Sequence, residues 1–189
     1  MRNKIFMLAT LAVSLLMASC EDDYKVYDTN QTDSVFFNYL NEKQTADSVI
    51  TYSFDYDIAQ SHVVEIPVSL MGIPKSEARS IELTVVKDST DMVEGVNYTI
   101  ERAEMAANEV SDTIKIKLLR DKDPEILTKE KKLRIAIVDN GHLRPTGQNT
   151  FTIKYSDIHP DRPKWWATFN PLPVYSYENA QLFFKYFYE

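Results

Sequence analysis

Apolar and polar side chains alternate with a period of two along much of the chain from Ser34 onward. The alternation is clearest in four stretches, and shorter runs occur at residues 34–38, 48–56, 98–102 and 150–155. Successive side chains of a β-strand point to opposite faces, so each stretch is predicted to be a strand with one apolar and one solvated face. The apolar positions of the four clearest stretches are Val64, Ile66, Val68 and Leu70; Ile81, Leu83 and Val85; Ile114, Ile116 and Leu118; and Leu133, Ile135 and Ile137.

About eight short strands are therefore expected in residues 34–157, with turn signals such as Asn140-Gly141 between them and no helical crossover. Strands joined by turns pair antiparallel, and two sheets with one apolar face each bury those faces by packing together. The pattern predicts an all-β fold, an antiparallel Ig-like β-sandwich. Pro67 has no N–H to donate to a neighbouring strand, so its strand is expected to lie at an edge or to carry a bulge.

After Tyr155 the alternation stops, and residues 158–189 form a segment rich in proline and aromatic residues. The four prolines between residues 160 and 173 exclude a helix or a central strand there. Ser176 is a suitable N-cap, and a short C-terminal helix is predicted over about residues 177–188. The residues expected to share its apolar face are Leu182, Phe183, Tyr186 and Phe187.

Three large aromatic residues precede this helix: Trp165, Trp166 and Phe169. One interpretation is that they are buried against the sandwich. The other is that they form an exposed platform that stacks on sugar rings or meets a partner protein, as large solvent-facing aromatic side chains do. The pattern leaves both interpretations open.

The N-terminus has the features of a signal peptide over residues 1–19. Arg2 and Lys4 precede fourteen uncharged residues, which as a helix would span about 21 Å, short of the roughly 30 Å hydrocarbon core of a bilayer. The following sequence Met17-Ala18-Ser19-Cys20 resembles the lipobox of bacterial lipoproteins, with Met where Leu is usual. That resemblance implies cleavage before Cys20 and its modification by lipid chains, including palmitate, which would anchor the protein in a membrane.

Residues 20–33 are predicted to be a lipidated acidic tether with a reach of at most about 45 Å. Its first residues, Glu21, Asp22 and Asp23, have two interpretations. They are a solvated start to a linker, or they resemble the surface-export signal of Bacteroidetes lipoproteins. The second interpretation predicts a lipid-anchored protein on the outer membrane that faces the cell surface, and the alternative is a lipoprotein that faces the periplasm.

Composition narrows the possible functions. The 189 residues suit one ordinary domain with a small appendage, and the single cysteine allows neither an internal disulfide nor a four-cysteine zinc site. The formal charge is −7, and Arg2 and Lys4 are the only charged residues of the leader, so the chain from Cys20 onward carries −9. Nucleic acid is therefore not an expected partner.

The sequence shows little that indicates catalysis. The three histidines, His62, His142 and His159, are scattered, and the chain has only four glycines, with no phosphate-binding loop and no nucleophile elbow. We therefore predict a protein that is not an enzyme and that needs no cofactor and no metal.

Part of the strand region resembles Calx-β-like modules. The run EGVNYTI is followed by NEVSDTIKIKLLRDKDPEILTKEKKLRIAI, in the order of a Gly-x-Asp-Tyr motif and two strands joined by an acidic loop. Asn97 replaces the Asp of that motif, and the remaining loop acids are Asp121, Asp123 and Glu125, with lysines between them. Calcium needs six to eight oxygen ligands, so a solvated loop is the preferred interpretation.

The order of segments along the whole chain resembles an uncharacterised domain-of-unknown-function family of Bacteroidetes surface lipoproteins. The features that carry the resemblance are the lipobox, the acidic tether, the strand module, Pro163-Lys164-Trp165-Trp166 and the Tyr175-Ser176 pair before an aromatic helix. Members are commonly encoded beside starch-utilisation-type outer-membrane transporters. The resemblance implies a non-enzymatic accessory or binding module of nutrient or glycan uptake, whose partners are a transporter complex or a polysaccharide.

A structural or adhesive surface protein, with the sandwich as a spacer, is the alternative function. Members of the family usually continue past the helix, whereas this chain ends at Glu189. The apolar face of the helix is therefore expected to fold back on a sheet or to meet a partner, unless the chain is a shortened version of the family.

Overall fold

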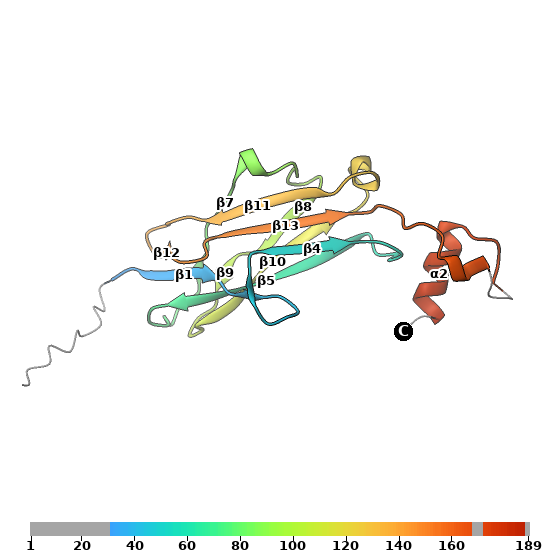
Figure 1. Cartoon of the computed structure of the whole chain (residues 1–189). Coiled ribbons are helices and arrows are strands. Elements are labelled where there is room, and N and C mark those ends of the chain that lie inside the picture. The colour runs from blue at the N-terminus through green and yellow to red at the C-terminus, as the bar shows by residue number, and fades with distance from the viewer. Residues whose placement is uncertain (1–30, 168–171, 188–189) are drawn as a thin grey trace, which may run out of the picture. The chain divides into compact units, whose positions relative to one another are not determined.

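The computed structural model describes residues 31–167 and 172–187, which form two main β-sheets, two small ones and one C-terminal helix (Figure 1). Residues 32–189 belong to one compact unit. The five-stranded sheet has the order β12 (Leu143–Pro145), β1 (Asp33–Phe37), β5 (Ser61–Met71), β10 (Ser111–Leu119) and β8 (Tyr98–Arg102). The four-stranded sheet has the order β4 (Val49–Ser53), β13 (Thr150–Ser156), β11 (Lys131–Ile137) and β7 (Leu83–Val85).

Shorter elements complete the fold. Two small two-stranded sheets are formed by β2 (Tyr39–Leu40) with β3 (Ala46–Asp47), and by β6 (Arg79–Ser80) with β9 (Glu104–Met105). Single 3₁₀ turns occur at η1 (Lys87–Ser89), η2 (Pro124–Leu127) and η3 (Lys164–Ala167), and the helix α2 spans Tyr177–Phe187. The prediction of an all-β sandwich-like fold with a short C-terminal helix is confirmed.

The core consists of the apolar positions that the alternation picks out. Val64, Ile66 and Val68 on β5 are at most 3% exposed, and the apolar positions of β10, β11 and β13 are equally buried. Most of the side chains that alternate with them are more exposed, and the majority of these are polar or charged. Full burial of one such aliphatic side chain stabilises a fold by about 1.5–3 kcal/mol, so the shared core of the two sheets is the main source of stability.

Two strand pairs are parallel, which the turn signals did not predict. β1 pairs parallel with β12, with Ser34 opposite Arg144, and β4 pairs parallel with β13, with Val49 opposite Thr152. Every other pair in the two main sheets is antiparallel. Parallel strands need a long connection rather than a tight turn, and both pairs join segments that lie far apart in the sequence. Local turn signals therefore carry no information about these pairs.

The expectation that the strand of Pro67 lies at an edge or carries a bulge was wrong, because the register of β5 with both neighbouring strands is continuous around Pro67. β5 is a central strand between β1 and β10. The carbonyl oxygen of Pro67 accepts a hydrogen bond from the N–H of Asn38 at 2.8 Å, just past the last residue of β1. In an antiparallel pair the N and O of one residue face the same neighbour, so the missing N–H of Pro67 faces the side where β1 has ended. The missing bond therefore falls where the pairing of β1 with β5 ends, and not in the interior of the ladder.

Candidate functional site

Most large aromatic residues of the C-terminal segment gather into one group, which we call the aromatic cluster: Trp165, Trp166, Tyr175, Phe183, Phe184 and Phe187. The turn η3 supplies the two tryptophans and α2 supplies the three phenylalanines. The ring of Trp166 meets the edges or faces of Phe183 and Tyr175 at centroid distances of 5.4 Å each. Trp165 lies 5.6 Å from Phe183 and 5.8 Å from Trp166. These distances are typical of favourable aromatic pairs.

The two tryptophans of η3 have different environments. Trp166 is 4% exposed, and its indole N–H donates to the carbonyl of Pro173 at 2.9 Å. Trp165 is 41% exposed. Trp166 is thus buried as the first interpretation of the sequence expected, although its ring partners belong to the C-terminal segment rather than to the sandwich. Trp165 presents part of its ring to solvent, as the platform interpretation expected. Phe169 lies outside the described residues.

The aromatic cluster is attached to the sandwich through the loop that follows β4. Tyr56 in that loop stacks on Phe184 at 4.4 Å with an interplanar angle of 14°. Its hydroxyl lies 3.4 Å from that of Tyr175. Burial raises the pKa of Tyr56, and the hydrogen bond with Tyr175 adds to the rise. The stacked ring gives α2 a fixed position on the sandwich.

A polar group at the same end of the sandwich fixes the start of α2, and we call it the Arg120 cluster: Arg120, Asp157 and Tyr177. The guanidinium of Arg120 binds Asp157 through two hydrogen bonds of 2.7 Å each, and the two side chains are 9% and 6% exposed. It also donates to the hydroxyl of Tyr177 at 3.0 Å and to the carbonyl of Ala59 at 3.1 Å. Bidentate pairs of this kind fix geometry as well as charge.

Tyr177 continues this network into the loop after β4. Its hydroxyl donates to the carbonyl of Asp55, and the side-chain amide of Gln181 on α2 donates to the carbonyl of Asp57 at 2.9 Å. Burial raises the pKa of Tyr177, and the charge of Asp157 raises it further. The Arg120 cluster therefore joins the end of β10, the residue after β13 and the first turn of α2.

Part of the apolar face of α2 is open to solvent. Phe183 contacts both tryptophans and Phe187. Leu182 is 52% exposed, Tyr186 64% and Phe187 78%. The residues predicted to share one face are thus divided between the interior of the aromatic cluster and its surface. Exposed apolar side chains of this kind can mark a site that binds a ligand or a partner protein.

The aromatic cluster and the start of β1 lie at opposite ends of the long strand β5. The residues that hold α2 immediately precede Ser61, the first residue of β5. Ser34 near the start of β1 pairs with Met71, the last residue of β5. Eleven residues of strand span roughly 35 Å, so the two ends are well separated.

The acidic loop singled out by the Calx-β resemblance forms an ion-pair network. The ammonium of Lys131, a 6% exposed residue, lies 2.5 Å from Glu125 and 3.2 Å from Asp123. The amide of Asn97 donates to Asp123 at 2.7 Å and to the hydroxyl of Tyr155 at 2.9 Å. Burial opposes ionisation of Asp123, but these donors outweigh it and lower its pKa.

The interpretation as a solvated loop was thus wrong for Asp123, whose side chain is 12% exposed, whereas Asp121 is exposed. In the described part of the chain, no three His, Cys, Asp or Glu side chains are close enough together to hold a metal ion.

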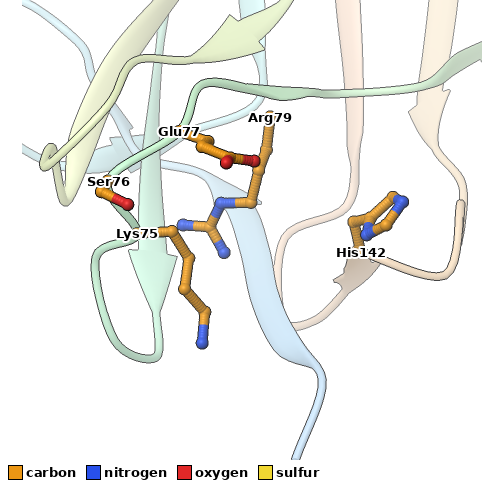
Figure 2. A pocket seen from close by; sticks show the side chains of 5 residues that line it. All are labelled: Lys75, Ser76, Glu77, Arg79 and His142. Carbon is orange, nitrogen blue, oxygen red and sulfur yellow. The ribbon is translucent and has the colours of Figure 1, made fainter.

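The three histidines lie in different places. His62 stacks on Tyr52 at 3.7 Å, and burial lowers its pKa. His159 stacks on Tyr177 at 3.5 Å, and thus supports the Arg120 cluster. His142 lines a pocket of about 320 Å³ beside Lys75, Ser76, Glu77 and Arg79 (Figure 2).

The guanidinium of Arg79 in this pocket is already engaged. It binds Asp33 at 2.6 Å, and the other carboxylate oxygen of Asp33 accepts from the N–H of Ile73 at 3.0 Å. A Cβ on Gly72 would lie 2.1 Å from Asp33, so the pair requires glycine at this position. The pocket therefore contains charges of both signs, and its arginine has a structural role.

Several predicted residues cannot be placed. Cys20, Glu21, Asp22 and Asp23 lie outside the described residues. Within the described ranges, no helix has both the length and the apolar character needed to cross a membrane.

The residues that position the candidate site were missed by sequence reasoning. Tyr56, Arg120 and Asp157 occur singly in loops and at strand ends, where charged and phenolic side chains are usually solvated. The one available signal was the aromatic content of the segment that they hold.

Comparison with known proteins gives a family and a few distant structural neighbours. Residues 27–187 match the family model described as "Domain of unknown function (DUF4843)". No curated protein matches the sequence. A two-domain protein of unknown function from Bacteroides fragilis is 15% identical, with a TM-score of 0.48 over 66% of this chain and 45% of that one.

Two structures from Bacteroides ovatus are similar at the same level. One, named a "putative carbohydrate binding protein", is 11% identical, with a TM-score of 0.46 over 66% of this chain and 37% of that one. The other, of unknown function, is 11% identical, with a TM-score of 0.44 over 64% of this chain and 43% of that one. The chain thus spans less than half of the length of each of these three proteins.

Proposed function

The chain belongs to the DUF4843 family, and we propose that this member is a non-enzymatic lipoprotein of the outer-membrane surface that binds polysaccharide as an accessory of nutrient uptake. The observation that carries the proposal is the half-exposed ring of Trp165, supported from behind by Trp166 and Phe183. A ring held in this way is already positioned for stacking, so little conformational entropy is lost on binding.

The chemistry of the aromatic cluster supports a sugar ligand. One face of a pyranose ring carries C–H groups that pack on an aromatic ring, and aromatic side chains are common in sites that bind such amphipathic ligands. Trp165 provides the ring, and the exposed side chains of Tyr186 and Phe187 extend the surface along α2. A polymer of several sugars would cover more of this surface than a single sugar.

The N-terminal sequence supports the location. With Cys20 lipidated, the tether leads into β1, and the aromatic cluster lies at the other end of β5. In this proposal, a ligand-binding surface at the end of β5 away from the start of β1 is accessible to polymers outside the cell. Glu21, Asp22 and Asp23 supply the export signal in this proposal.

Retention on polysaccharide gels tests the ligand. Affinity electrophoresis of the full chain through soluble starch, xylan and galactomannan is expected to show retardation by at least one polymer, and Trp165→Ala is expected to remove it. Met71→Ala is the matched control, because Met71 is 60% exposed but lies at the far end of β5. Unretarded migration of the unmodified chain in all three polymers would contradict the proposal.

Metabolic labelling tests the anchor. Labelled palmitate is expected to enter the full chain and to be absent from Cys20→Ser; equal labelling of both would refute lipidation. Replacing Glu21, Asp22 and Asp23 with alanine is expected to protect the protein from protease added to whole cells. Persistent cleavage of that variant would exclude these acids as the export signal.

A transporter complex is the second proposed partner. Co-purification of an outer-membrane transporter with the full chain from solubilised membranes would support a role in uptake. The absence of both polysaccharide binding and a transporter would instead favour the structural or adhesive function, with the sandwich as a spacer.

A further inference from the structure

We infer that a second carbohydrate site lies beside the β2–β3 hairpin and that it takes a neutral sugar ring and rejects an acidic one. The site is a pocket of about 440 Å³, which we call the Tyr39 pocket. Its walls come from the end of β1, the β2–β3 hairpin and the loop at residues 147–148. Pockets that bind small molecules usually measure about 300–1,000 Å³, so one sugar residue fits this space.

Aromatic rings form the apolar part of the Tyr39 pocket. Phe36 lies between the buried residues Val35 and Phe37 on β1, and it is half-exposed because neighbouring residues of a strand face opposite sides. Tyr39 is half-buried, and its ring packs edge-on against Phe151 of the core at 5.6 Å and 85°. Both residues line the pocket, and the contact with Phe151 holds the ring of Tyr39 in place.

Two side-chain amides at the rim each have one N–H donor engaged and their carbonyl oxygen available. The amide nitrogen of Asn38 donates to the hydroxyl of Ser69 at 2.9 Å, and that of Gln148 donates to the carbonyl of Thr150 at 2.6 Å. Among the described residues, neither side-chain carbonyl oxygen receives a hydrogen bond. Each can therefore accept one from a sugar hydroxyl.

The charge of the pocket selects against acidic ligands. Asp47 lines it, and the N–H groups of Ser48 and Val49 donate to one of its oxygens at 2.7 and 3.2 Å. The bond from Ser48 is the main reason why the pKa of Asp47 is lowered, so this carboxylate is ionised at neutral pH. None of the described residues that line the pocket is a lysine, an arginine or a histidine. A ligand carboxylate would meet a like charge with no cation to compensate it.

This inference rests on the proposed function for the class of ligand, but it concerns residues that are separate from the aromatic cluster. The Tyr39 pocket contains aromatic rings, hydrogen-bond acceptors and one negative charge, whereas the pocket of Lys75 and Arg79 contains cations. Of these two pockets, only the first has the composition suited to a neutral polyol.

Matched pairs of methyl glycosides test the inference. Saturation-transfer NMR on the full chain in detergent would compare methyl glucoside with methyl glucuronide, and methyl galactoside with methyl galacturonide. We expect at least one neutral sugar to bind and its acidic counterpart to bind with about tenfold lower affinity. A difference of this size is the effect expected of one contact between like charges. Asp47→Asn keeps an acceptor for Ser48 and Val49 and is expected to remove most of this difference.

Two further variants locate the site. Gln148→Ala is expected to weaken binding of the neutral sugar about fivefold, because one hydrogen bond is lost, and to leave the melting temperature unchanged. Lys75→Ala in the other pocket is the control and is expected to change nothing. Equal binding of acidic and neutral sugars, no binding of either neutral sugar, or full binding by Gln148→Ala would each overturn the inference.

The failure of this inference is distinguishable from failure of the proposed function. If polymer retention depends on Trp165 while no glycoside binds the Tyr39 pocket, the inference fails and the proposed function stands. If glycoside binding depends on Gln148 while Trp165→Ala leaves polymer retention unchanged, the role of the aromatic cluster fails and the pocket stands.

Discussion

The sandwich and the C-terminal segment are stabilised in different ways. In the sandwich, every second side chain of four long strands enters one shared core, and residues such as Ile66, Ile116 and Leu133 are completely buried. In the segment after β13, ring contacts and the Arg120 cluster hold a turn and a helix in place. The first kind of stability is spread over many similar contacts, and the second depends on a few specific groups. The two regions should therefore respond differently to mutation.

Phe151→Ala is expected to have the largest effect, because it removes a fully buried ring from the core between Phe37 and Tyr39. Loss of a buried phenylalanine costs about 3–5 kcal/mol of unfolding free energy. Urea denaturation followed by circular dichroism would measure it. The exposed residue Tyr186 provides the control, since Tyr186→Ala is expected to change stability by less than about 0.5 kcal/mol. Equal losses in both variants would contradict a core centred on β13.

Arg120→Met is expected to have a smaller effect, which is concentrated in α2. It leaves Asp157 unpaired, but both residues border a pocket of about 310 Å³ that can admit water, so the cost is expected to be about 1–3 kcal/mol. Hydrogen exchange should show loss of protection in α2 while β5 and β10 stay protected.

Arg134→Met is the matched control for this variant, because Arg134 is exposed on β11. Uniform loss of protection over the whole domain in Arg120→Met would show that the two regions unfold as one unit.

Ser176→Ala is expected to cost about 1 kcal/mol, the usual value of an N-cap, and to affect α2 alone. The hydroxyl of Ser176 accepts from the N–H of Asn179 at 3.1 Å. Glycine at the same position is expected to cost only a few tenths of a kcal/mol, because it also tolerates the N-cap backbone. Tryptophan fluorescence, which reports on η3, would follow the change. A loss of equal size in both variants would argue against a side-chain cap.

Titration is expected to have no effect at neutral pH and to separate the two regions at the extremes. Burial opposes ionisation of Asp112, but Arg102 and the N–H groups of Thr113 and Ala106 outweigh it and lower its pKa below 3.8. Ionised Asp112 therefore stabilises the fold above pH 3.8. This stabilisation is lost as the pH falls through the pKa that Asp112 has in the folded protein. Asp112→Asn should flatten the acid side of a plot of melting temperature against pH.

The C-terminal segment should respond at alkaline pH, where Tyr98 and Tyr155 of the sheets, whose pKa values burial also raises, contribute as well. Burial and the charge of Asp157 raise the pKa of Tyr177 above 10.0, so its contribution is present below pH 10 and is lost as the pH rises through the folded value. As the pH rises above 10, tryptophan fluorescence should change before the circular dichroism of the sheets does. Tyr177→Phe should remove part of this change in fluorescence. Loss of the fluorescence and circular dichroism signals at the same pH would contradict the idea that the two regions respond separately.

The sequence predicted the sandwich well because its information is local and repeated. The alternation at Val64, Ile66 and Val68 depends only on the geometry of a strand, and all three are buried as expected. The predicted N-cap at Ser176 and the helix that follows it are also confirmed.

The parallel pairs of β1 and β4 and the central position of Pro67 depend instead on which distant segment lies beside each strand. A periodic pattern contains no such information.

The candidate site was predictable only in part. The aromatic composition indicated a functional segment, but Trp165 and Trp166 are adjacent in sequence and only the position of α2 decides which of them is buried. Arg120 and Asp157 are 37 positions apart and look like solvated charges until the fold brings them together. The positions of the Asn38 and Gln148 amides beside one pocket likewise become recognisable only when the fold is known.

The parallel pairing of β4 has a consequence for how the chain folds. Among the described residues, β13 is the only strand beside β4. Val49 pairs with Thr152, so about 100 residues must be synthesised after β4 before it has this partner. At about 5–20 residues per second, this delay lasts roughly 5–20 s. Throughout that time the uncharged stretch Val-Ile-Thr-Tyr-Ser is an open edge with high aggregation propensity. Such high contact order favours slow folding that follows synthesis, so the nascent chain is expected to need a chaperone for this strand.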